Sequence, residues 1–166
     1  ILMTAHRREN LGEPLAGICT AIRRIVEDYR DIEVIYPVHL NPAVQNPVLQ
    51  ILGNTDRVHL IAPLDVEDMH NLIGRSFLVI TDSGGLQEEA PACGKPVLVL
   101  RRETERPEAV EAGTVKVVGV DMETVYQETA RLLTDANEYN RMARAVNPYG
   151  DGHASERIVR HILERV

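Results

Sequence analysis

The stretch Phe77–Ala90, FLVITDSGGLQEEA, joins an apolar run to a polar turn with two glycines and a segment with two adjacent glutamates. A continuous apolar run is typical of a strand that a parallel sheet buries on both faces. The polar turn and its glycines interrupt this run and predict that a helix starts directly after the strand. The stretch therefore predicts a strand–turn–helix unit, the building block of an α/β fold.

The same alternation extends along the rest of the chain. After the strand-like opening ILMTA, buried strands are predicted at Val34–Val38, Val58–Ile61, Phe77–Thr81, Val97–Leu100 and Val115–Val118. Helices are predicted at Pro14–Tyr29, Pro42–Leu52, Val66–Arg75, Gly85–Cys93, Met122–Thr134, Asn137–Ala145 and Ser155–Val166. The first and last helices each carry one stripe of apolar residues at steps of three and four. The pattern predicts a single doubly wound α/β domain with a parallel sheet over residues 1–166.

Composition and charge narrow the function classes. The chain has 166 residues, of which 44% are hydrophobic and 26% charged, as is usual for a globular domain. A net charge of −7 argues against general nucleic-acid binding, which needs a basic surface. No apolar run approaches the roughly 20 residues of a membrane span. The two cysteines show neither disulfide nor metal spacing, which favours a reducing cytoplasm.

The beginning of the chain favours a piece cut from a longer protein. The sequence opens on the apolar run ILMTA, with no initiator methionine and no leader. We expect a complete domain to start outside a buried strand.

The turn TDSGG predicts an anion site. Either Asp82 or Ser83 can cap the following helix through a side-chain oxygen. Gly84 and Gly85 leave backbone N–H groups open to close approach, and a helix start carries a partial positive charge. Together these features form a phosphate cradle that needs no basic side chain. A capped helix with a glycine turn is the alternative, because a glycine pair is a weak motif.

The two glutamates after the turn favour a nucleotide over a simple phosphate. Glu88 and Glu89 are about 100° apart on a helix, so they face different directions. One can face solvent, and the other can project over the turn. A carboxylate there repels a phosphate but accepts hydrogen bonds from the hydroxyls of a ribose. A diphosphate on the glycines with a ribose beside it is the layout of a nucleoside diphosphate.

Other polar loops follow predicted strands at the same edge of the sheet. TAHRREN carries His6 and Arg7, YPVHLNP carries His39, and a charged loop spans residues 101–108. Histidine donates protons near neutral pH, and arginine binds phosphate oxygens in a fork. Each loop alone is compatible with simple solvation, but their convergence on one crevice favours a ligand. The remaining histidines, His59, His70, His153 and His161, show no partners and are interpreted as structural, and no metal motif is visible.

Six motifs in register resemble one enzyme family along nearly the whole chain. They are TAHRREN, YPVHLNP, LDVEDMHNL, TDSGGLQEEAPACGKPVLVLR, TERPEAVEAGT and NPYGDGHAS. In this order they resemble the C-terminal half of bacterial non-hydrolysing UDP-N-acetylglucosamine 2-epimerases. The resemblance implies a two-domain fold like that of one large glycosyltransferase class, in which this chain is the C-terminal UDP-binding domain. It also implies interconversion of UDP-N-acetylglucosamine and UDP-N-acetylmannosamine by UDP elimination and re-addition through 2-acetamidoglucal.

The resemblance assigns roles to individual residues. It places Ser83, Gly84 and Gly85 at the diphosphate, Glu89 at the ribose, Arg106 at the nucleotide, Met69 near the uracil and His6 beside the leaving diphosphate. Arg7 and His39 match contacts that some members make to a second, activating UDP-N-acetylglucosamine. Family members often have an aromatic residue where this chain has Met69. The carboxylates that handle the C2 proton belong to the N-terminal domain, so the present chain alone is expected to be inactive.

The resemblance also implies partners and context. It implies UDP and UDP-N-acetylglucosamine as ligands, no metal or redox cofactor, and no nucleic-acid or membrane partner. It further implies a homodimer for the full-length enzyme and a cytoplasmic role in cell envelope polysaccharide biosynthesis. Three alternatives stay open. The chain could be the C-terminal domain of a UDP-sugar glycosyltransferase, part of a hydrolysing epimerase that releases UDP and free N-acetylmannosamine, or a non-catalytic nucleotide-sugar module.

Overall fold

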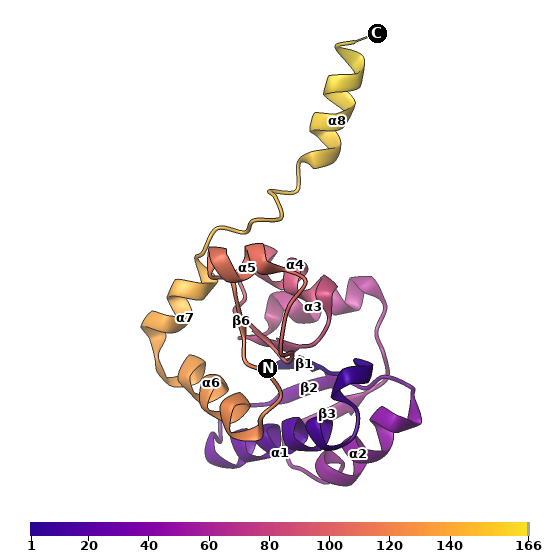
Figure 1. The fold of residues 1–166 in the computed structure, drawn as a ribbon, viewed down its shortest axis with the longest axis vertical. Helices are drawn as coiled ribbons and strands as arrows, with labels where there is room; N and C mark the ends of the chain where they lie inside the picture. The colour runs from indigo at the N-terminus through magenta and orange to yellow at the C-terminus, as the bar shows by residue number, and fades with distance from the viewer. Residues whose placement is uncertain (166) are drawn as a thin grey trace.

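The computed structural model describes residues 1–165 as a six-stranded sheet with helices on both faces (Figure 1). The strands are β1 (Leu2–Thr4), β2 (Val34–Pro37), β3 (Val58–Ile61), β4 (Val79–Thr81), β5 (Val97–Val99) and β6 (Val115–Val117). Their order in the sheet is β3-β2-β1-β4-β5-β6, and every neighbouring pair is parallel. This is the strand order of the Rossmann fold, so the predicted fold class is confirmed.

The helices agree with the sequence prediction within one or two residues, except at the end of the last one. They are α1 (Glu13–Asp28), α2 (Pro42–Leu52), α3 (Val66–Arg75), α4 (Gly84–Ala92), α5 (Pro107–Ala112), α6 (Met122–Thr134), α7 (Ala136–Ala143) and α8 (Ala154–Leu163). The prediction extended α8 to Val166, which lies outside the described residues. It missed α5 and the 3-10 helix η1 (Arg8–Asn10). Both are too short to show a repeating apolar stripe.

Two hydrophobic clusters hold the helices against opposite faces of the sheet. The larger one joins the sheet to α1, α2, α6 and α7. The smaller one joins it to α3, α4 and α5. Because both faces are covered, the strand residues of β4 and β5 are buried throughout, which explains their continuous apolar sequence.

Helix α1 shows how the apolar stripe is used. Gly12 precedes the helix with a φ of +81°, a value that glycine adopts without a steric penalty, and Pro14 lies in the first turn. The stripe then faces the sheet and the neighbouring helices α2 and α6. Its residues Leu15, Ile18, Cys19, Ile22, Ile25 and Val26 are all 0% exposed. The predicted face is therefore a core face.

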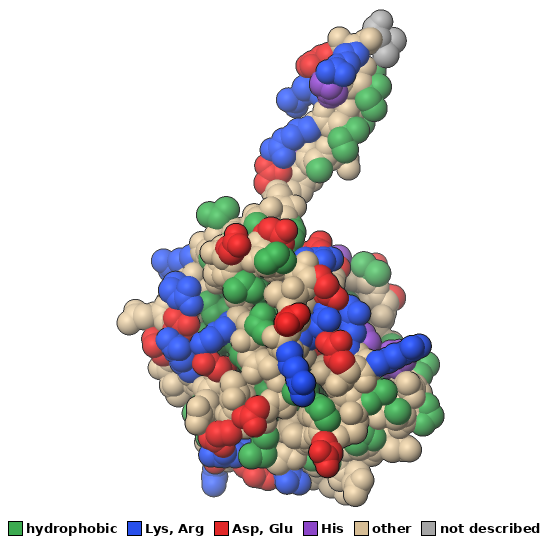
Figure 2. All heavy atoms as spheres, in the orientation of Figure 1, with side chains coloured by type: hydrophobic (Ala, Val, Ile, Leu, Met, Phe, Trp, Pro, Cys, Tyr) green, Lys and Arg blue, Asp and Glu red, His purple; other side chains and the backbone are tan. Residues whose placement is uncertain are grey.

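Helix α8 differs from the others because it projects away from the domain at the end of an extended segment (Figure 1). Its apolar side chains lie along one side of the helix and its charged side chains along the other (Figure 2). Ile158, Val159, Ile162 and Leu163 are 59%, 54%, 56% and 70% exposed. The predicted stripe is present, but no other described residue covers it. None of the described helices is both long enough and apolar enough to cross a membrane.

The middle of the sheet is where the direction of chain winding reverses. From β1 the chain passes to β2 on one side, and from β4 it passes to β5 on the other. In such sheets the carboxyl ends of the strands at this reversal form a crevice that binds ligands. Here Thr4 ends β1 and Thr81 ends β4, and their hydroxyl oxygens are 2.6 Å apart. The loops that follow these two residues carry most of the predicted site.

Candidate functional site

A pocket of about 260 Å³ opens at the carboxyl ends of β1, β2, β3 and β4. It is lined by Thr4, His6, Pro37, His39, Pro63, Leu64, Met69, Ser83, Gly85, Leu86 and Glu89. The residues His6, His39, Met69, Ser83, Gly85 and Glu89 were all predicted from the sequence. The other predicted residues, Arg7, Gly84 and Arg106, lie next to one another at the start of α4. The loops that were predicted to converge therefore do meet at one sheet edge.

The start of α4 has open backbone donors. The helix begins at Gly84, and Ser83 is its N-cap residue but makes no side-chain cap hydrogen bond. The expectation that Asp82 or Ser83 caps this helix is therefore wrong. Instead, the backbone N–H of Ser83 donates to the Thr81 hydroxyl at 2.9 Å. The first N–H groups of α4 are thus left to an external acceptor, next to the positive end of the helix dipole.

Asp82 joins the glycine turn to the loop after β1. Its side chain is 0% exposed. One carboxylate oxygen, Oδ2, accepts from the backbone N–H groups of His6 at 2.8 Å and Arg7 at 2.7 Å, and from Asn10 Nδ2 at 3.0 Å. Asn10 Nδ2 also donates to the Leu100 carbonyl at 2.9 Å. The charge of a buried carboxylate is thereby compensated by hydrogen bonds that set the path of the His6 loop.

His6 lies between Asp82 and His39. Its Nδ1 is 3.5 Å from Asp82 Oδ1, and its ring stacks on that of His39 with centroids 5.4 Å apart and planes at 8°. Tyr36 of β2 holds the loop that carries His6, because its hydroxyl donates to the Ala5 carbonyl at 2.7 Å. Burial raises the pKa of Tyr36 well above its usual range, so this hydroxyl stays a donor. His6 is therefore held by neighbours from β2 and from the turn after β4.

Two guanidinium groups lie beside Gly84. An added Cβ at Gly84 would be 3.8 Å from both Arg7 Nη2 and Arg106 Nη2. Arginine pairs with phosphate oxygens through charge-assisted hydrogen bonds. Arg7 and His39, which the sequence assigned together to a second ligand, thus lie differently: His39 lines the pocket and Arg7 flanks the start of α4.

Glu88 holds one of these arginines. The guanidinium of Arg106 donates through Nε to Glu88 Oε1, and this hydrogen bond raises the pKa of Arg106. Both side chains are about one-third exposed, at 34% for Arg106 and 38% for Glu88. Glu88 is thus partly exposed to solvent, as expected for one glutamate of the pair, and it also has a partner that the sequence does not predict.

Glu89 points to the pocket, as predicted for one of the two glutamates. It lines the pocket together with Met69, and its Oε2 is 3.2 Å from His70 Nε2. The sequence prediction gave His70 no partner, and this is wrong. The same correction applies to His59 and His153, which lie 3.1 Å from Glu33 and 3.2 Å from Glu156.

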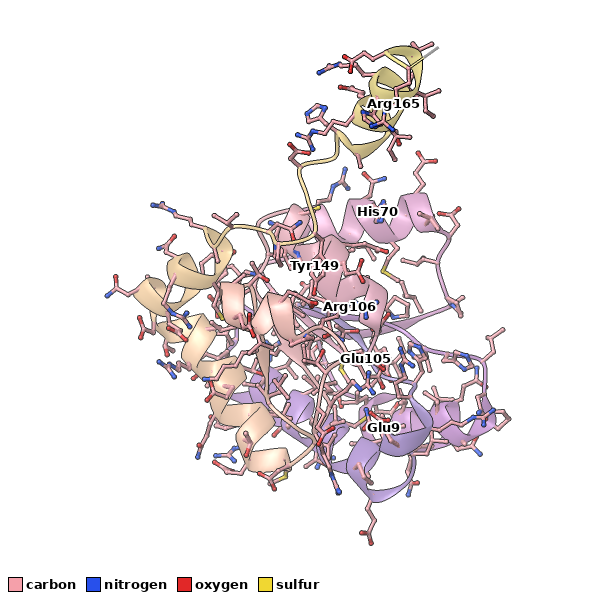
Figure 3. All side chains as sticks on the ribbon, turned by 45° about the horizontal axis from the view of Figure 1, so that its top comes forward. Glu9, His70, Glu105, Arg106, Tyr149 and Arg165 are labelled. Atoms are coloured by element: carbon pink, nitrogen blue, oxygen red, sulfur yellow. The ribbon has the colours of Figure 1, made fainter. Side chains whose placement is uncertain are left out.

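The loop before α5 is tied to the rest of the site. Arg101 Nε donates to Glu9 at 2.8 Å, and Arg101 Nη1 pairs with Glu105. The hydrogen bond from Arg101 lowers the pKa of Glu105. Glu9, Glu105 and Arg106 follow one another along the same side of the domain (Figure 3). The Thr104 hydroxyl accepts from the Arg106 backbone N–H at 3.0 Å, which fixes the residue that approaches Gly84.

The residues that the sequence reasoning missed act through other side chains. The sequence predicts Asp82 only as a possible helix cap and Tyr36 only as part of a buried strand, whereas both position the His6 loop. A signal was available for Asp82, because an acidic residue directly after a buried strand faces the ligand edge of the sheet. Among residues 1–165, no group of three or more His, Cys, Asp or Glu side chains is placed to hold a metal ion.

The sequence and the fold have counterparts among known proteins. Residues 1–163 match the UDP-N-acetylglucosamine 2-epimerase family. The chain belongs to this family. It is 60% identical to the UDP-N-acetylglucosamine 2-epimerase of Bacillus subtilis over 163 residues, and the match covers 98% of this chain and 43% of that protein. The chain thus spans less than half the length of the curated relatives it matches.

Solved epimerase structures confirm the fold. The Staphylococcus aureus MnaA–UDP co-structure is 56% identical, with a TM-score of 0.93, and the match covers 97% of this chain and 44% of that one. UDP-GlcNAc 2-epimerase from Neisseria meningitidis, solved bound to UDP-GlcNAc, is 45% identical, with a TM-score of 0.92 and coverage of 98% and 44%. Both of these relatives were therefore solved with a nucleotide ligand.

Proposed function

We propose that this chain is the C-terminal, UDP-binding half of an enzyme that interconverts UDP-N-acetylglucosamine and UDP-N-acetylmannosamine. The observation that carries the proposal is one pocket that joins the uncapped start of α4 to Glu89 and His6. Relatives solved with UDP and with UDP-GlcNAc support a nucleotide as the occupant. Family membership supports epimerisation over glycosyl transfer.

The diphosphate binds at the start of α4 in this proposal. The free N–H groups of the first turn and the helix dipole attract an anion there. The absence of a side chain at Gly85 leaves space for the diphosphate between Ser83 and Glu89. A Cβ added at Gly85 would lie in that space, 3.3 Å from Glu89 Oε1 and 3.9 Å from Ser83 Oγ. The guanidinium groups of Arg7 and Arg106 supply positive charge beside Gly84. An acidic chain thus forms a locally basic site.

The nucleoside binds deeper in the same pocket. Glu89 is one helical turn beyond the glycines, and its carboxylate accepts hydrogen bonds from the ribose hydroxyls. Met69 packs against the uracil, since a flexible thioether side chain can cover a flat ring. His70 stays beside Glu89 and restricts its rotation.

The proposed reaction proceeds by elimination and re-addition. A base removes the proton from C2, the C1–O bond breaks, and UDP leaves with the electron pair, which gives 2-acetamidoglucal. UDP then adds back to C1 after C2 receives a proton on the opposite face. In this chain His6 donates a hydrogen bond or a proton to the leaving diphosphate. The groups that move the C2 proton belong to the remainder of the enzyme, so this half alone does not epimerise.

A second, activating UDP-N-acetylglucosamine is part of the proposal. Arg7 and His39 contact it, and the position of Arg7 beside Gly84 gives this residue a second contact, to the diphosphate. In the complete enzyme, His39→Ala should remove activation by the substrate more than it weakens UDP binding, because His39 also lines the pocket. Arg7→Ala should weaken both. Hyperbolic kinetics in the unmodified enzyme would overturn the activating role.

We make three further proposals about the complete enzyme. It is a homodimer, it works in the cytoplasm, and its product feeds cell envelope polysaccharide synthesis. Sedimentation of the complete enzyme tests the first, and fractionation of cells tests the second. Loss of an envelope polysaccharide on deletion tests the third.

Deuterium exchange tests the proposed reaction. The complete enzyme, incubated with UDP-N-acetylglucosamine in deuterated water, should form UDP-N-acetylmannosamine with deuterium at C2. The same incubation with the present chain alone should give neither product nor exchange. Release of free N-acetylmannosamine with UDP would identify a hydrolysing epimerase instead. Exchange by the isolated chain would show that the proposed division of labour between the two halves is wrong.

A further inference from the structure

The carboxylate of Asp82 has one oxygen that the fold leaves unused. Its side chain is 0% exposed, and Oδ2 is occupied by the donors from His6, Arg7 and Asn10. Oδ1 is buried and makes no hydrogen bond. A buried anionic oxygen without a donor is costly and is expected to have a functional reason. Nδ1 of His6 lies 3.5 Å from this oxygen and is a candidate donor.

His6 can complete this interaction. Its side chain is 36% exposed, so the ring has room for the small rotation that brings Nδ1 within bonding distance of Oδ1. The imidazole must then carry a hydrogen on Nδ1, because a carboxylate only accepts. The other ring nitrogen, Nε2, is left for the pocket, which His6 lines.

We propose that Asp82 is a positioning residue that fixes the orientation and the Nδ1–H form of His6, so that Nε2 faces the leaving diphosphate. That the ligand is the diphosphate of UDP rests on the proposed function. When His6 is protonated, the carboxylate balances its charge and Nε2–H donates a charge-assisted hydrogen bond to a phosphate oxygen. The buried charge of Asp82 is thereby coupled to the negative charge that develops on UDP as the C1–O bond breaks.

His39 supports the same arrangement from the other side of the ring. The backbone N–H of Asn41 donates to His39 Nδ1 at 3.1 Å, so the hydrogen of neutral His39 is on Nε2. A neutral His39 stacks on His6 without placing a second positive charge at 5.4 Å. The two imidazoles thus have opposite hydrogen-bonding forms, and only the Nδ1–H of His6 faces a carboxylate.

The substitution Asp82→Asn separates positioning from simple packing. The asparagine oxygen can still accept from the backbone N–H groups of His6 and Arg7, which keeps the loop in place. Its amide nitrogen then faces His6 Nδ1 as a donor. Nδ1 must become an acceptor, and the ring hydrogen moves to Nε2.

Proton–nitrogen correlation spectra of the His6 ring in the ¹⁵N-labelled chain measure this change directly. Nδ1 should be protonated in the unmodified chain and unprotonated in the Asp82→Asn variant. As a control, Asn10→Ala removes another donor to Asp82 and should leave the His6 ring unchanged. An Nε2–H form in the unmodified chain would overturn the proposal, whether or not the variant folds. The same ring form in both proteins would overturn it as well.

UDP titration of the two proteins tests the consequence for the ligand. Asp82→Asn should weaken UDP affinity about tenfold, as should His6→Ala, and the two changes together should cost no more than either alone. A change of ring form with unchanged UDP affinity would show that the positioning has no role in binding. Failure of the unmodified chain to bind UDP would instead contradict the proposed function, since the ring spectra do not depend on the ligand.

Discussion

Helices α1 and α8 carry the same kind of sequence pattern and have opposite surroundings. Both have an apolar stripe at helical spacing, but the stripe of α1 is 0% exposed and that of α8 is more than half exposed. The stripe of α1 faces the sheet, α2 and α6, whereas α8 projects from the domain (Figure 1). Periodicity therefore predicts that a helix forms and which face is apolar. It does not identify what covers that face.

The pocket and α8 also differ in whether the described chain supplies their neighbours. The pocket is formed by segments that follow β1, β2, β3 and β4, and the sheet order brings these segments together. The residues that line it thus all belong to the part of the chain that packs on the sheet. The apolar face of α8 has no such neighbour among residues 1–165. The domain should therefore fold and bind its ligand without help from α8.

The largest expected effect comes from the buried apolar stripe of α1. Ile22→Ala in α1 removes a fully buried side chain and should lower the free energy of unfolding by about 2–5 kcal/mol. Urea denaturation followed by circular dichroism measures the change. A loss below about 1 kcal/mol would show that α1 is not packed as described.

The next effect tests the ribose contact. Glu89→Ala should weaken UDP binding by about 1.5–3 kcal/mol for each charge-assisted hydrogen bond that is lost. Calorimetric titration of the chain with UDP measures the loss. The exposed Glu111, on α5, provides the control, because Glu111→Ala leaves the pocket untouched. Equal losses for the two variants would contradict the assignment.

Glu88 should affect UDP binding indirectly, through its contact with Arg106. Because Glu88 holds Arg106 beside Gly84, Glu88→Ala frees the guanidinium and should weaken UDP binding less than Glu89→Ala. A loss as large as that of Glu89→Ala would mean that Glu88 also touches the ligand.

A smaller effect is expected for Gly85→Ala, which should weaken UDP binding without lowering the free energy of unfolding. Gly85→Ala places a methyl group 3.3 Å from Glu89 Oε1 and should weaken UDP binding by at least about tenfold, or ~1.4 kcal/mol. Folding stability should not fall, because alanine is up to about 1 kcal/mol more favourable than glycine in a helix. In the control Gly74→Ala an added Cβ meets nothing within 4 Å, and UDP affinity should be unchanged. Normal UDP affinity in Gly85→Ala would place the diphosphate elsewhere.

The sequence predicted the fold better than the site because the two depend on different information. The buried strands and most helices have periods that one chain shows directly, as Ile22 does in the stripe of α1. The glycine turn and Glu89 were recognisable because backbone access and helix position are local properties. The contacts of Asp82 with His6 and of Glu88 with Arg106 join residues that are 76 and 18 positions apart. Only the sheet order places them together.

The smallest expected effect concerns α8. Ile162→Ala removes an apolar side chain that is 56% exposed, so the free energy of unfolding of the chain should change by less than about 0.5 kcal/mol. The same urea experiment as for Ile22→Ala provides the comparison. A loss of about 2 kcal/mol or more would show that α8 packs against the domain in solution.

The proposed nucleotide site is tested most directly by following backbone amide signals while UDP is added to the ¹⁵N-labelled chain. We expect saturable shifts of Gly84, Gly85 and Glu89, because the proposal places the diphosphate at the start of α4 and the ribose at Glu89. The signals of α8 should stay in place throughout the titration. Unchanged signals at Gly84 and Gly85 in the presence of saturating UDP would contradict the claim that this pocket is the nucleotide site.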